Sequence, residues 1–567
     1  MYNLLIGGAA GQGIETSVSI LQKILKNSGY KIFTVRDFMS RVRGGHNFSL
    51  VRFGTETIFS HSDQLDGIVA LTEETIKLHS GQLKSNGFIV SDSKFAPEDR
   101  EVIKADFTAI GKELGNPRVL GSIAVGIILK IFSLKVEDGA RVLREFVKEQ
   151  YLDVNIQALS KGYELADSRY PLHRGDGKED MLLTGNEAVG LGAIAAGLRF
   201  YSAYPMSPST SVMEYLADQS LEAGIVVEQA EDEIAAINMA IGASFAGVPA
   251  MTGTSGGGFS LMVEALGLAG IAEIPIVILN VQRPGPATGL PTRTEQSDLK
   301  FMISASQGEF PRMVIAIRNH NDAFHQTARA MHLAEKYQIP VLLLSDQYLG
   351  DSYATVKPYN LAGVHRVDPK RTAEAYLAEK LSGQNEDLEY RRYRFTEDGI
   401  SPRLIPGISK HLVTADSDEH DEYGKITESA EVRTRMMDKR LGKMKLLEQE
   451  LQEPKFIGAD EFDYLLIGWG STYGPIKEAI RHLNKEKEKR YAALVFGDIY
   501  PLPQKLLIEK AGKAGKIINV EQNATGQLAQ LIREQTGIEC DISILKYDGR
   551  QISAEEIADR IRKEVMA

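Results

Sequence analysis

The sequence contains a single cysteine, Cys540, among its 567 residues. One thiol cannot form an internal disulfide, and it cannot supply the set of cysteines that usually holds an iron–sulfur cluster. If electrons leave this protein through a cluster, we expect that cluster on another polypeptide. No apolar run approaches the ~20 residues needed to span a bilayer. The opening residues run into a glycine loop without a basic leader, so we expect a cytoplasmic protein with no membrane segment.

Basic residues are fewer than acidic residues. The chain has 65 Lys and Arg against 76 Asp and Glu, a net charge of −11. Binding to a nucleic-acid backbone depends on a basic face that displaces counterions, so a role with nucleic acid is disfavoured. The hydrophobic content of 43% and charged content of 25% are ordinary for a globular protein. The length allows three or four domains of about 150 residues.

Apolar strands alternate with helical patterns along most of the chain, which predicts an α/β fold of mostly parallel, doubly wound sheets. A polar, glycine-rich break at Pro171–Lys178 ends the first unit, and Met181–Thr184 opens the next. A charged helical stretch, Ser429–Glu453, precedes a last α/β unit that begins at Phe462. The predicted domains are residues 1–175, 180–380 and 456–567, with an irregular and helical connection at 381–455.

A glycine loop, Gly7–Gly13, follows the first predicted strand and precedes the helix Ile14–Ser28. Glycines allow the backbone to approach a phosphate, and the amides of a helix N-terminus attract anions. The spacing is not G-x-G-x-x-G, and Asp37 is a weak candidate for a ribose carboxylate. A tight turn that binds nothing is an equal alternative.

Four further segments hold polar residues at the ends of apolar stretches. Each has an ordinary explanation when taken alone. Prolines lead into a helix capped by Ser209 or Thr210, acidic residues complement the dipole of a predicted helix Glu228–Gly247, and a glycine run turns from strand to helix. The four segments are Tyr204–Thr210, Glu228–Glu233, Thr252–Gly258 and Gln282–Gln296.

In their order and spacing these segments resemble the catalytic α subunit of 2-oxoacid:ferredoxin oxidoreductases. The resemblance implies three doubly wound domains: a Rossmann-like γ domain, a domain that binds the pyrimidine side of thiamine diphosphate, and a transketolase-C-like domain. The family reaction is the reversible oxidative decarboxylation of a 2-oxoacid to acyl-CoA and CO₂ with reduction of ferredoxin. Coenzyme A is the cosubstrate.

The resemblance also implies residue roles. Glu233 falls at the family's catalytic glutamate, which bonds N1′ of the aminopyrimidine, and Glu231 is the alternative if the register slips by two. Such a carboxyl is expected to have a raised pKa in a dry cleft. Ser207, where the family has threonine, and Arg283 orient the substrate. Thr292 and Arg293 match the same substrate loop, although Arg293 could instead brace that loop through Glu295. The residues expected to line the cofactor are Tyr204, Pro205, Thr254, Ser255 and Gly256.

The first domain is similar to the family's γ domain, which is associated with coenzyme A. The similarity rests on the glycine loop together with Arg43–His46 and Asn116–Gly121. It makes Gly11, Gly13 and Arg43 candidate contacts for coenzyme A phosphates.

Some motifs are expected to have only a structural role or to imitate a functional motif without its function. Gly175-Asp176-Gly177 imitates the start of a Mg-diphosphate motif, but no asparagine pair follows at the required distance. We therefore expect no metal on this chain, and a β subunit that holds the diphosphate, Mg²⁺ and a [4Fe–4S] cluster in an (αβ)₂ assembly. Asn186 is expected to cap a helix. Asp498–Pro503 and Glu521–Leu528 resemble parts of the transketolase-C-like domain and are expected to be scaffold.

The substrate is less well defined than the class of enzyme. The fusion of γ and α parts, with His46 and the Pro291–Arg293 loop, is most similar to the 2-oxoglutarate type. Pyruvate, branched-chain 2-oxoacids and indolepyruvate are the alternatives. A more distant alternative is a non-catalytic protein that binds coenzyme A or a nucleotide through its first domain, but that reading leaves Tyr204–Gln296 without a role.

Overall fold

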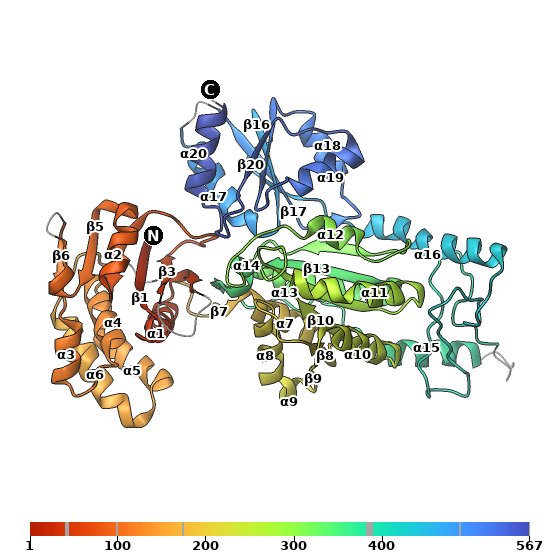
Figure 1. Cartoon of the computed structure of the whole chain (residues 1–567), viewed down its shortest axis with the longest axis horizontal. Helices are drawn as coiled ribbons and strands as arrows, with labels where there is room; N and C mark the ends of the chain where they lie inside the picture. The colour runs from red at the N-terminus through yellow and green to blue at the C-terminus, as the bar shows by residue number, and fades with distance from the viewer. Residues whose placement is uncertain (40–44, 98–99, 173–174, 382–388, 487–488, 566–567) are drawn as a thin grey trace. The chain divides into compact units, whose positions relative to one another are not determined.

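The computed structural model describes residues 1–39, 45–97, 100–172, 175–381, 389–486 and 489–565 (Figure 1). The chain divides into two compact units. The first comprises Met1–Thr184, Asp351–Pro358 and Ser553–Glu555, and the second comprises the remainder. Both are mixed α/β structures, as the alternation of strands and helices predicts.

The first unit is built on one eight-stranded sheet. Its strands are β1 (Tyr2–Ala9), β2 (Lys31–Asp37), β3 (His46–Gly54), β4 (Leu65–Ala70), β5 (Leu83–Ser91), β6 (Val102–Lys104), β7 (Met181–Thr184) and β14 (Tyr353–Val356), in the order β6-β5-β4-β1-β3-β2-β14-β7. Strands β6, β5, β4 and β1 are parallel, as expected. Strand β3 is antiparallel to β1 and β2, because the link from Asp37 to His46 is too short for a parallel crossover of a dozen or more residues.

Two segments near the end of the first unit have packing partners that the sequence did not indicate. Strand β7, expected to open the next unit, pairs with β14 in this sheet. The decoy tripeptide Gly175–Gly177 packs on Gly29, and Gly177 N donates to Gly29 O at 2.9 Å. A Cβ at Gly29 or Gly175 would overlap the backbone of the other. These glycines are therefore explained by close backbone packing.

The helices of the first unit cover an apolar core. They are α1 (Ile14–Asn27), α2 (Glu73–His79), α3 (Phe107–Glu113), α4 (Leu120–Ile131), α5 (Val136–Phe146) and α6 (Glu149–Glu164), with short 3₁₀ turns η1 (Ser80–Gln82) and η2 (Ser93–Phe95). Helix α4 is apolar on nearly all sides and packs against α6. Close packing needs glycine at two positions, because a Cβ at Gly126 or Gly162 would overlap the backbone of the facing helix.

The second unit contains a seven-stranded sheet. Its strands are β8 (Phe200–Ala203), β9 (Val226–Gln229), β10 (Ala250–Thr254), β11 (Ile276–Gln282), β12 (Met313–Ala316), β13 (Pro340–Asp346) and β18 (Asp498–Tyr500), in the order β18-β12-β13-β11-β10-β8-β9. Every pair is parallel except β18 with β12. Strands β10 to β13 are buried along their whole length, as expected for a parallel sheet covered on both faces.

Helices pack on both faces of this sheet (Figure 1). They are α7 (Gly185–Ala195), α8 (Thr210–Asp218), α9 (Ser220–Ala223), α10 (Glu233–Phe245), α11 (Gly256–Ile271), α12 (Leu299–Ser304), α13 (His320–Tyr337) and α14 (Gln347–Asp351). The predicted helix Glu228–Gly247 was wrong at its start, because Val226–Gln229 forms β9. Asp232 caps α10 by accepting from Ala235 N at 2.7 Å, so the helix begins at Glu233.

A five-stranded sheet completes the second unit. Its strands are β15 (Lys455–Ile457), β16 (Tyr464–Trp469), β17 (Tyr491–Phe496), β19 (Lys516–Glu521) and β20 (Ile542–Leu545), in the order β15-β17-β16-β19-β20, with η3 (Gly470–Thr472), α17 (Tyr473–Leu483), α18 (Lys505–Ala511), α19 (Gln527–Thr536) and α20 (Ala554–Val565). Strand β18 follows β17 in the chain but pairs with β12 of the seven-stranded sheet, so it links the two sheets of this unit.

The connection before this sheet contains α15 (Pro369–Leu381) and α16 (Ala430–Glu450). Helix α16 is anchored by buried ion pairs, in which Lys439 and Lys443 both contact the Glu273 carboxylate. Burial alone would raise the pKa of Glu273, but the two lysines and Arg392 outweigh it and hold this pKa well below its usual range. Arg392 also donates to the Glu273 carbonyl at 2.8 Å.

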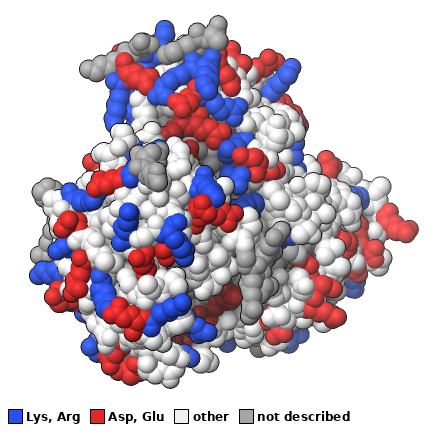
Figure 2. Space-filling model, turned by 60° about the vertical axis from the view of Figure 1, so that its left-hand side comes forward, with Lys and Arg blue, Asp and Glu red and all other residues white. Residues whose placement is uncertain are grey.

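The surface carries charges of both signs. On the face shown in Figure 2, acidic and basic side chains are interspersed and no broad basic patch is visible. Within the residues that the structure describes, no helix combines the length and apolarity of a membrane span.

Candidate active site

The four polar segments predicted from the sequence meet at one edge of the seven-stranded sheet. Strands β8, β10 and β11 are parallel and neighbouring, so the loops after their carboxyl ends converge there. These loops begin at Tyr204, Ser255 and Arg283, and Glu233 starts α10 beside them. The arrangement is where open α/β sheets place ligands.

Glu233 is a buried carboxylic acid at this edge, with 3% of its surface exposed. Asp232 already caps α10, which leaves the Glu233 side chain free for another role. Among the described residues its Oε1 has no hydrogen-bond partner. Burial raises the pKa of Glu233, and the Arg283 guanidinium only partly opposes that rise. Glu231, the alternative in the sequence prediction, is exposed.

The glycine run at the start of α11 permits the close approach of this acid. A Cβ at Gly258 would overlap both Thr254 Oγ1 and Glu233 Oε1. Ser255, the residue before the helix, is fully buried, and its hydroxyl has no partner in the part of the chain that is described. A buried polar group without a partner costs about 1–3 kcal/mol. Several such groups at one edge indicate a place for a polar ligand.

Asn280 and Asp298 are site residues that the sequence analysis missed. Asn280 is fully buried near the end of β11 and faces Thr254 across the strand pair. Its Nδ2 donates to Asp298 Oδ2 at 2.9 Å, and its Oδ1 lacks a partner among the described residues. Burial raises the pKa of Asp298. The available signal was a polar residue inside the apolar strand Ile276–Gln282.

Arg283 and Ser207 are brought together as the sequence predicts, but through the backbone. Arg283 Nη1 donates to Ser207 O at 2.6 Å. Burial lowers the pKa of Arg283, and the carboxylates of Asp298 and Glu233 oppose this change. The guanidinium therefore interacts electrostatically with two acids and bonds the backbone of the proline loop.

Asn186 does not cap a helix, contrary to the sequence prediction. Helix α7 begins one residue earlier, and Asn186 is fully buried inside it. Its Nδ2 donates to Pro208 O at 2.9 Å and to Ser211 Oγ at 2.8 Å. Asn186 thus holds the proline loop in place through these two hydrogen bonds. The sequence feature that could have indicated this role is a polar residue within an apolar helix.

The remaining candidate residues lie around this centre. Tyr204 is 40% exposed, and Pro205 is half-buried. Thr292 and Arg293 are half-buried on the returning arm of the loop that starts at Arg283. The Arg293 side chain lies against Gly549 of the five-stranded domain.

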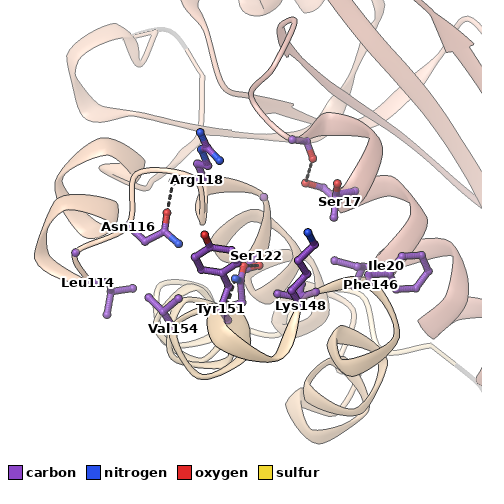
Figure 3. A pocket seen from close by; sticks show the side chains of 16 residues that line it. Ser17, Ile20, Leu114, Asn116, Arg118, Ser122, Phe146, Lys148, Tyr151 and Val154 are labelled. Carbon is purple, nitrogen blue, oxygen red and sulfur yellow. Dashed lines mark hydrogen bonds between the residues drawn. The ribbon is translucent and has the colours of Figure 1, made fainter.

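The first unit has its own cavity, of about 740 Å³, beside the glycine loop (Figure 3). Gly13 has φ 79° and precedes α1 without any side-chain cap, so the first amides of this helix have no capping side chain. Gly11 is exposed nearby with φ 91°, and Arg43 lies outside the described residues. Figure 3 shows the loop around Asn116 on one side and α1 on the other. The other lining residues that bear on ligand chemistry are Arg118, Lys148, Phe146 and Tyr151.

Two family models match the chain. The family model for "Pyruvate flavodoxin/ferredoxin oxidoreductase, thiamine diP-bdg" matches residues 191–439, and the model for "Pyruvate ferredoxin/flavodoxin oxidoreductase" matches residues 3–165. The first match contains every residue of the candidate active site except Asn186, and the second contains the cavity of the first unit.

Similar proteins extend over nearly the entire chain. The 2-oxoacid:ferredoxin oxidoreductase subunit alpha of Sulfolobus sp is 33% identical, over 99% of this chain and 96% of that protein. The 2-oxoglutarate oxidoreductase subunit KorA of Mycobacterium tuberculosis is 28% identical, over 89% of this chain and 82% of that protein. A solved 2-oxoglutarate:ferredoxin oxidoreductase from Magnetococcus marinus, with 2-oxoglutarate, coenzyme A and succinyl-CoA bound, is 31% identical with a TM-score of 0.91, covering 100% of this chain and 99% of that one.

The fold and the matched thiamine-diphosphate-binding domain define an oxidoreductase that acts on 2-oxoacids. The chain belongs to the 2-oxoacid:ferredoxin oxidoreductase family, as an α subunit. The names of its relatives describe one subunit of a larger assembly.

Proposed function

We propose that this chain is the catalytic α subunit of a thiamine-diphosphate-dependent enzyme that converts 2-oxoglutarate and coenzyme A to acyl-CoA and CO₂, with reduction of ferredoxin. The observation that carries the proposal is the buried Glu233 carboxyl, whose Oε1 has no partner among the described residues, inside the matched thiamine domain. A protonated carboxyl of raised pKa fits a ring nitrogen that accepts a hydrogen bond. When bound, thiamine diphosphate supplies the carbanion that attacks the oxo group.

The side chains around Glu233 take supporting roles in this proposal. Glu233 holds a proton against the aminopyrimidine nitrogen, while Thr254, Ser255 and Gly256 line the ring with Tyr204 and Pro205. Arg283 pairs with the carboxylate of the 2-oxoacid, since a guanidinium suits bidentate binding of a carboxylate. Ser207, Thr292 and Arg293 complete the substrate site.

The choice of 2-oxoglutarate is supported by relatives rather than by the pocket chemistry. The Magnetococcus marinus structure contains 2-oxoglutarate, and the Mycobacterium tuberculosis relative is a 2-oxoglutarate oxidoreductase. Initial rates of viologen reduction across 2-oxoglutarate, pyruvate, a branched-chain 2-oxoacid and indolepyruvate test the choice. We expect the highest kcat/KM for 2-oxoglutarate, and a higher value for another acid would contradict it.

Coenzyme A is placed by this proposal in the cavity of the first unit. The uncapped start of α1 at Gly13, with Gly11 beside it, suits a phosphate. Arg118 and Lys148 supply positive charge, and the partly exposed rings of Phe146 (42%) and Tyr151 (45%) offer faces on which an adenine could stack.

Titration calorimetry tests this placement. Arg118→Ala or Lys148→Ala should weaken coenzyme A binding about 10-fold, since each removes a charge-assisted contact to phosphate. Lys112→Ala, on an exposed lysine outside the cavity, is the control. Unchanged affinity for coenzyme A in both cavity variants would indicate that coenzyme A binds elsewhere. Tight binding by the chain, together with no oxoacid turnover by the complex with the partner subunit, would instead favour the non-catalytic alternative.

A β subunit is the proposed carrier of the diphosphate, Mg²⁺ and the [4Fe–4S] cluster, in an (αβ)₂ assembly that reduces ferredoxin. Its docking surface is the face of α10 next to Glu233. The exposed residues of α10 carry no charge, and Ile234 and Met239 are 49% and 42% exposed. On α11, Leu261 is 49% exposed as well. Exposed apolar side chains on an uncharged helix face are typical of protein interfaces.

Purification of the chain with and without its partner tests the split site. We expect viologen reduction only from the complex. An Ile234→Lys variant should lose the partner on gel filtration, whereas Leu221→Lys, on an exposed leucine of α9, should retain it. Turnover by the chain alone would contradict the proposal.

A further inference from the structure

The loop that starts at Arg283 depends on the five-stranded domain for its position. Its tip, residues 285–290, is exposed throughout. The loop closes on itself where Leu290 N donates to Pro284 O at 3.1 Å. Its returning arm, Thr292–Asp298, is bonded to the other domain: Thr294 N donates to Gly549 O at 3.1 Å, and Gln296 N donates to Gln522 O at 2.7 Å. This arm carries the proposed substrate residues.

Side chains reinforce the same attachment. Asn523 Nδ2 donates to Gln296 O at 3.1 Å, and Gln296 Nε2 donates to Trp469 O at 3.1 Å. Gln527 Nε2 donates to Ser297 O at 2.7 Å. Backbone and side chain of Gln296 are thus both held by residues of the five-stranded domain.

The Glu521 carboxylate accepts hydrogen bonds from two of the residues that hold the arm, Trp469 and Asn523. Glu521 is fully buried, and its carboxylate accepts from Trp469 Nε1 at 3.0 Å and from Asn523 Nδ2 at 2.8 Å. Two backbone amides at the start of α19 donate to it as well, from Leu528 and Ala529. Several donors and a helix N-terminus stabilise the charge. The group Glu521, Asn523 and Trp469 is called the hub below.

We propose that the hub positions the returning arm Thr292–Asp298 and thereby sets the affinity for the 2-oxoacid, with Asn523 as the positioning residue. The inference rests on the proposed function. An exposed loop that must be ordered on binding lowers affinity, whereas one held in its bound shape does not. Without the hub the arm has to order when substrate binds, so KM rises while the chemical step, which depends on Glu233, is little changed.

A purely structural role for the hub predicts a different result. If Asn523 only holds the domains together, its loss lowers thermal stability and leaves KM unchanged. Asn484 provides a matched comparison, because it bridges backbone in the same domain away from the loop: its Nδ2 donates to Tyr491 O at 3.0 Å, and its Oδ1 accepts from Tyr491 N at 2.8 Å.

The experiment compares Asn523→Asp with Asn484→Asp in the complex with the partner subunit. Asn523→Asp keeps the acceptor for Gly526 N but removes the donor to Gln296 O and to the Glu521 carboxylate. We expect its KM for the 2-oxoacid to rise about 10-fold, with kcat changed less than about 3-fold and the KM for coenzyme A unchanged. Asn484→Asp should lower the melting temperature without changing KM.

Trp469 gives a second readout, because it is the only tryptophan of the chain. Its indole donates to Glu521 and its carbonyl accepts from Gln296. In the isolated full-length chain, Asn523→Asp should shift Trp469 emission to longer wavelength, and Asn484→Asp should not. A shifted emission with unchanged KM would overturn the proposal, as would an equal rise in KM in both variants.

A second variant covers the case in which Asn523→Asp does not fold. Gln296→Glu removes the side-chain donor that bonds Trp469 O and the Asp346 carboxyl, and we expect a rise in KM of about 3-fold; an unchanged KM would overturn the proposal. Failure of the proposed function is distinguishable, because it would appear as a wild-type complex without turnover of any 2-oxoacid. Failure of the present inference appears as normal turnover with an unshifted KM.

Discussion

A buried glutamate lies at each end of helix α11, and the hydrogen bonding and pKa of the two carboxyls differ in opposite directions. At the N-terminal end Glu233 is 3% exposed, has an oxygen without a partner among the described residues, and has a raised pKa. Just after the C-terminal end Glu273 is 1% exposed, contacts Lys439 and Lys443, and has a lowered pKa.

Burial alone therefore does not separate a functional acid from a structural one. An unpartnered buried polar group costs stability, and a protein keeps one where a ligand will use it. A paired buried charge anchors the elements that carry its partners, here α16, and removal of one partner is costly. The state of the hydrogen bonds around each carboxyl distinguishes the site from the scaffold.

Glu233→Gln should have the largest effect on activity. Loss of a positioned acid costs about 10²–10⁴ in rate, so we expect oxoacid turnover by the complex to fall by this factor while the melting temperature does not fall. Glu231→Gln, at the exposed acid two residues earlier, is the control. If the two variants lose activity equally, the assignment of Glu233 is wrong.

Glu273→Gln should have the largest effect on stability. It leaves two lysines buried without their counter-charge, and we expect an unfolding free energy lower by about 3–5 kcal/mol, measured as an earlier urea midpoint. Turnover per folded molecule should stay near that of the wild type. Glu264→Gln, on an exposed glutamate of α11, is the control and should change neither quantity.

Arg283→Lys should affect substrate binding more than the chemical step. A lysine cannot reproduce the bidentate contact, so we expect KM for the 2-oxoacid to rise about 10-fold. Arg199→Lys is the matched control, because Arg199 also donates to backbone carbonyls of this domain but at the opposite end of β8. A fall in kcat with an unchanged KM would place Arg283 in the chemical step instead.

The pH dependence of stability should show the smallest effect, with opposite signs for the two acids. Glu273 has a lowered pKa, so its stabilisation is present above the ordinary value of 4.5 and is lost as pH falls. Glu233 has a raised pKa, so the native state tolerates it best below 4.5 and is penalised as pH rises through the raised value. Melting temperatures between pH 4 and pH 8 should therefore place Glu273→Gln below the wild type and Glu233→Gln at or above it.

Both gaps should narrow toward the acid end of this range, because protonation of Glu273 in the unfolded state reduces the stabilisation that its ion pairs provide, and protonation of Glu233 in the folded state removes its penalty. The comparison between the two carboxyls would be contradicted if both variants melted below the wild type. It would also be contradicted if the differences in melting temperature from the wild type grew larger in acid.

Local sequence patterns predicted the α/β class of the fold and several of its elements. The alternation of strands and helices identified β1 and α1 to within a few residues, whereas β9 was predicted as the start of a helix. Pairings between distant segments were beyond this reasoning. Strand β7 joins the first sheet because it pairs with β14, and no local pattern indicates a partner so far along the chain. The division into four domains stays a prediction.

The candidate site was predicted from the order of its motifs, and its supporting residues were not. Resemblance placed Glu233, Ser207 and Arg283, and the structure brings these side chains to one sheet edge. Asn186 and Asn280 act through contacts to other segments, which local sequence does not reveal. Their signal was physical: an amide inside an apolar helix or strand needs a partner.

The central claim is that the Glu233 carboxyl activates thiamine diphosphate held jointly with a partner subunit. Deuterium exchange of the thiazolium C2 proton, followed by quenched-flow NMR on the complex loaded with thiamine diphosphate and Mg²⁺, measures this activation directly. We expect exchange in Glu233→Gln to be slower than in the wild type by at least about 10², with cofactor affinity nearly unchanged. Equal exchange rates in the two proteins would contradict the claim.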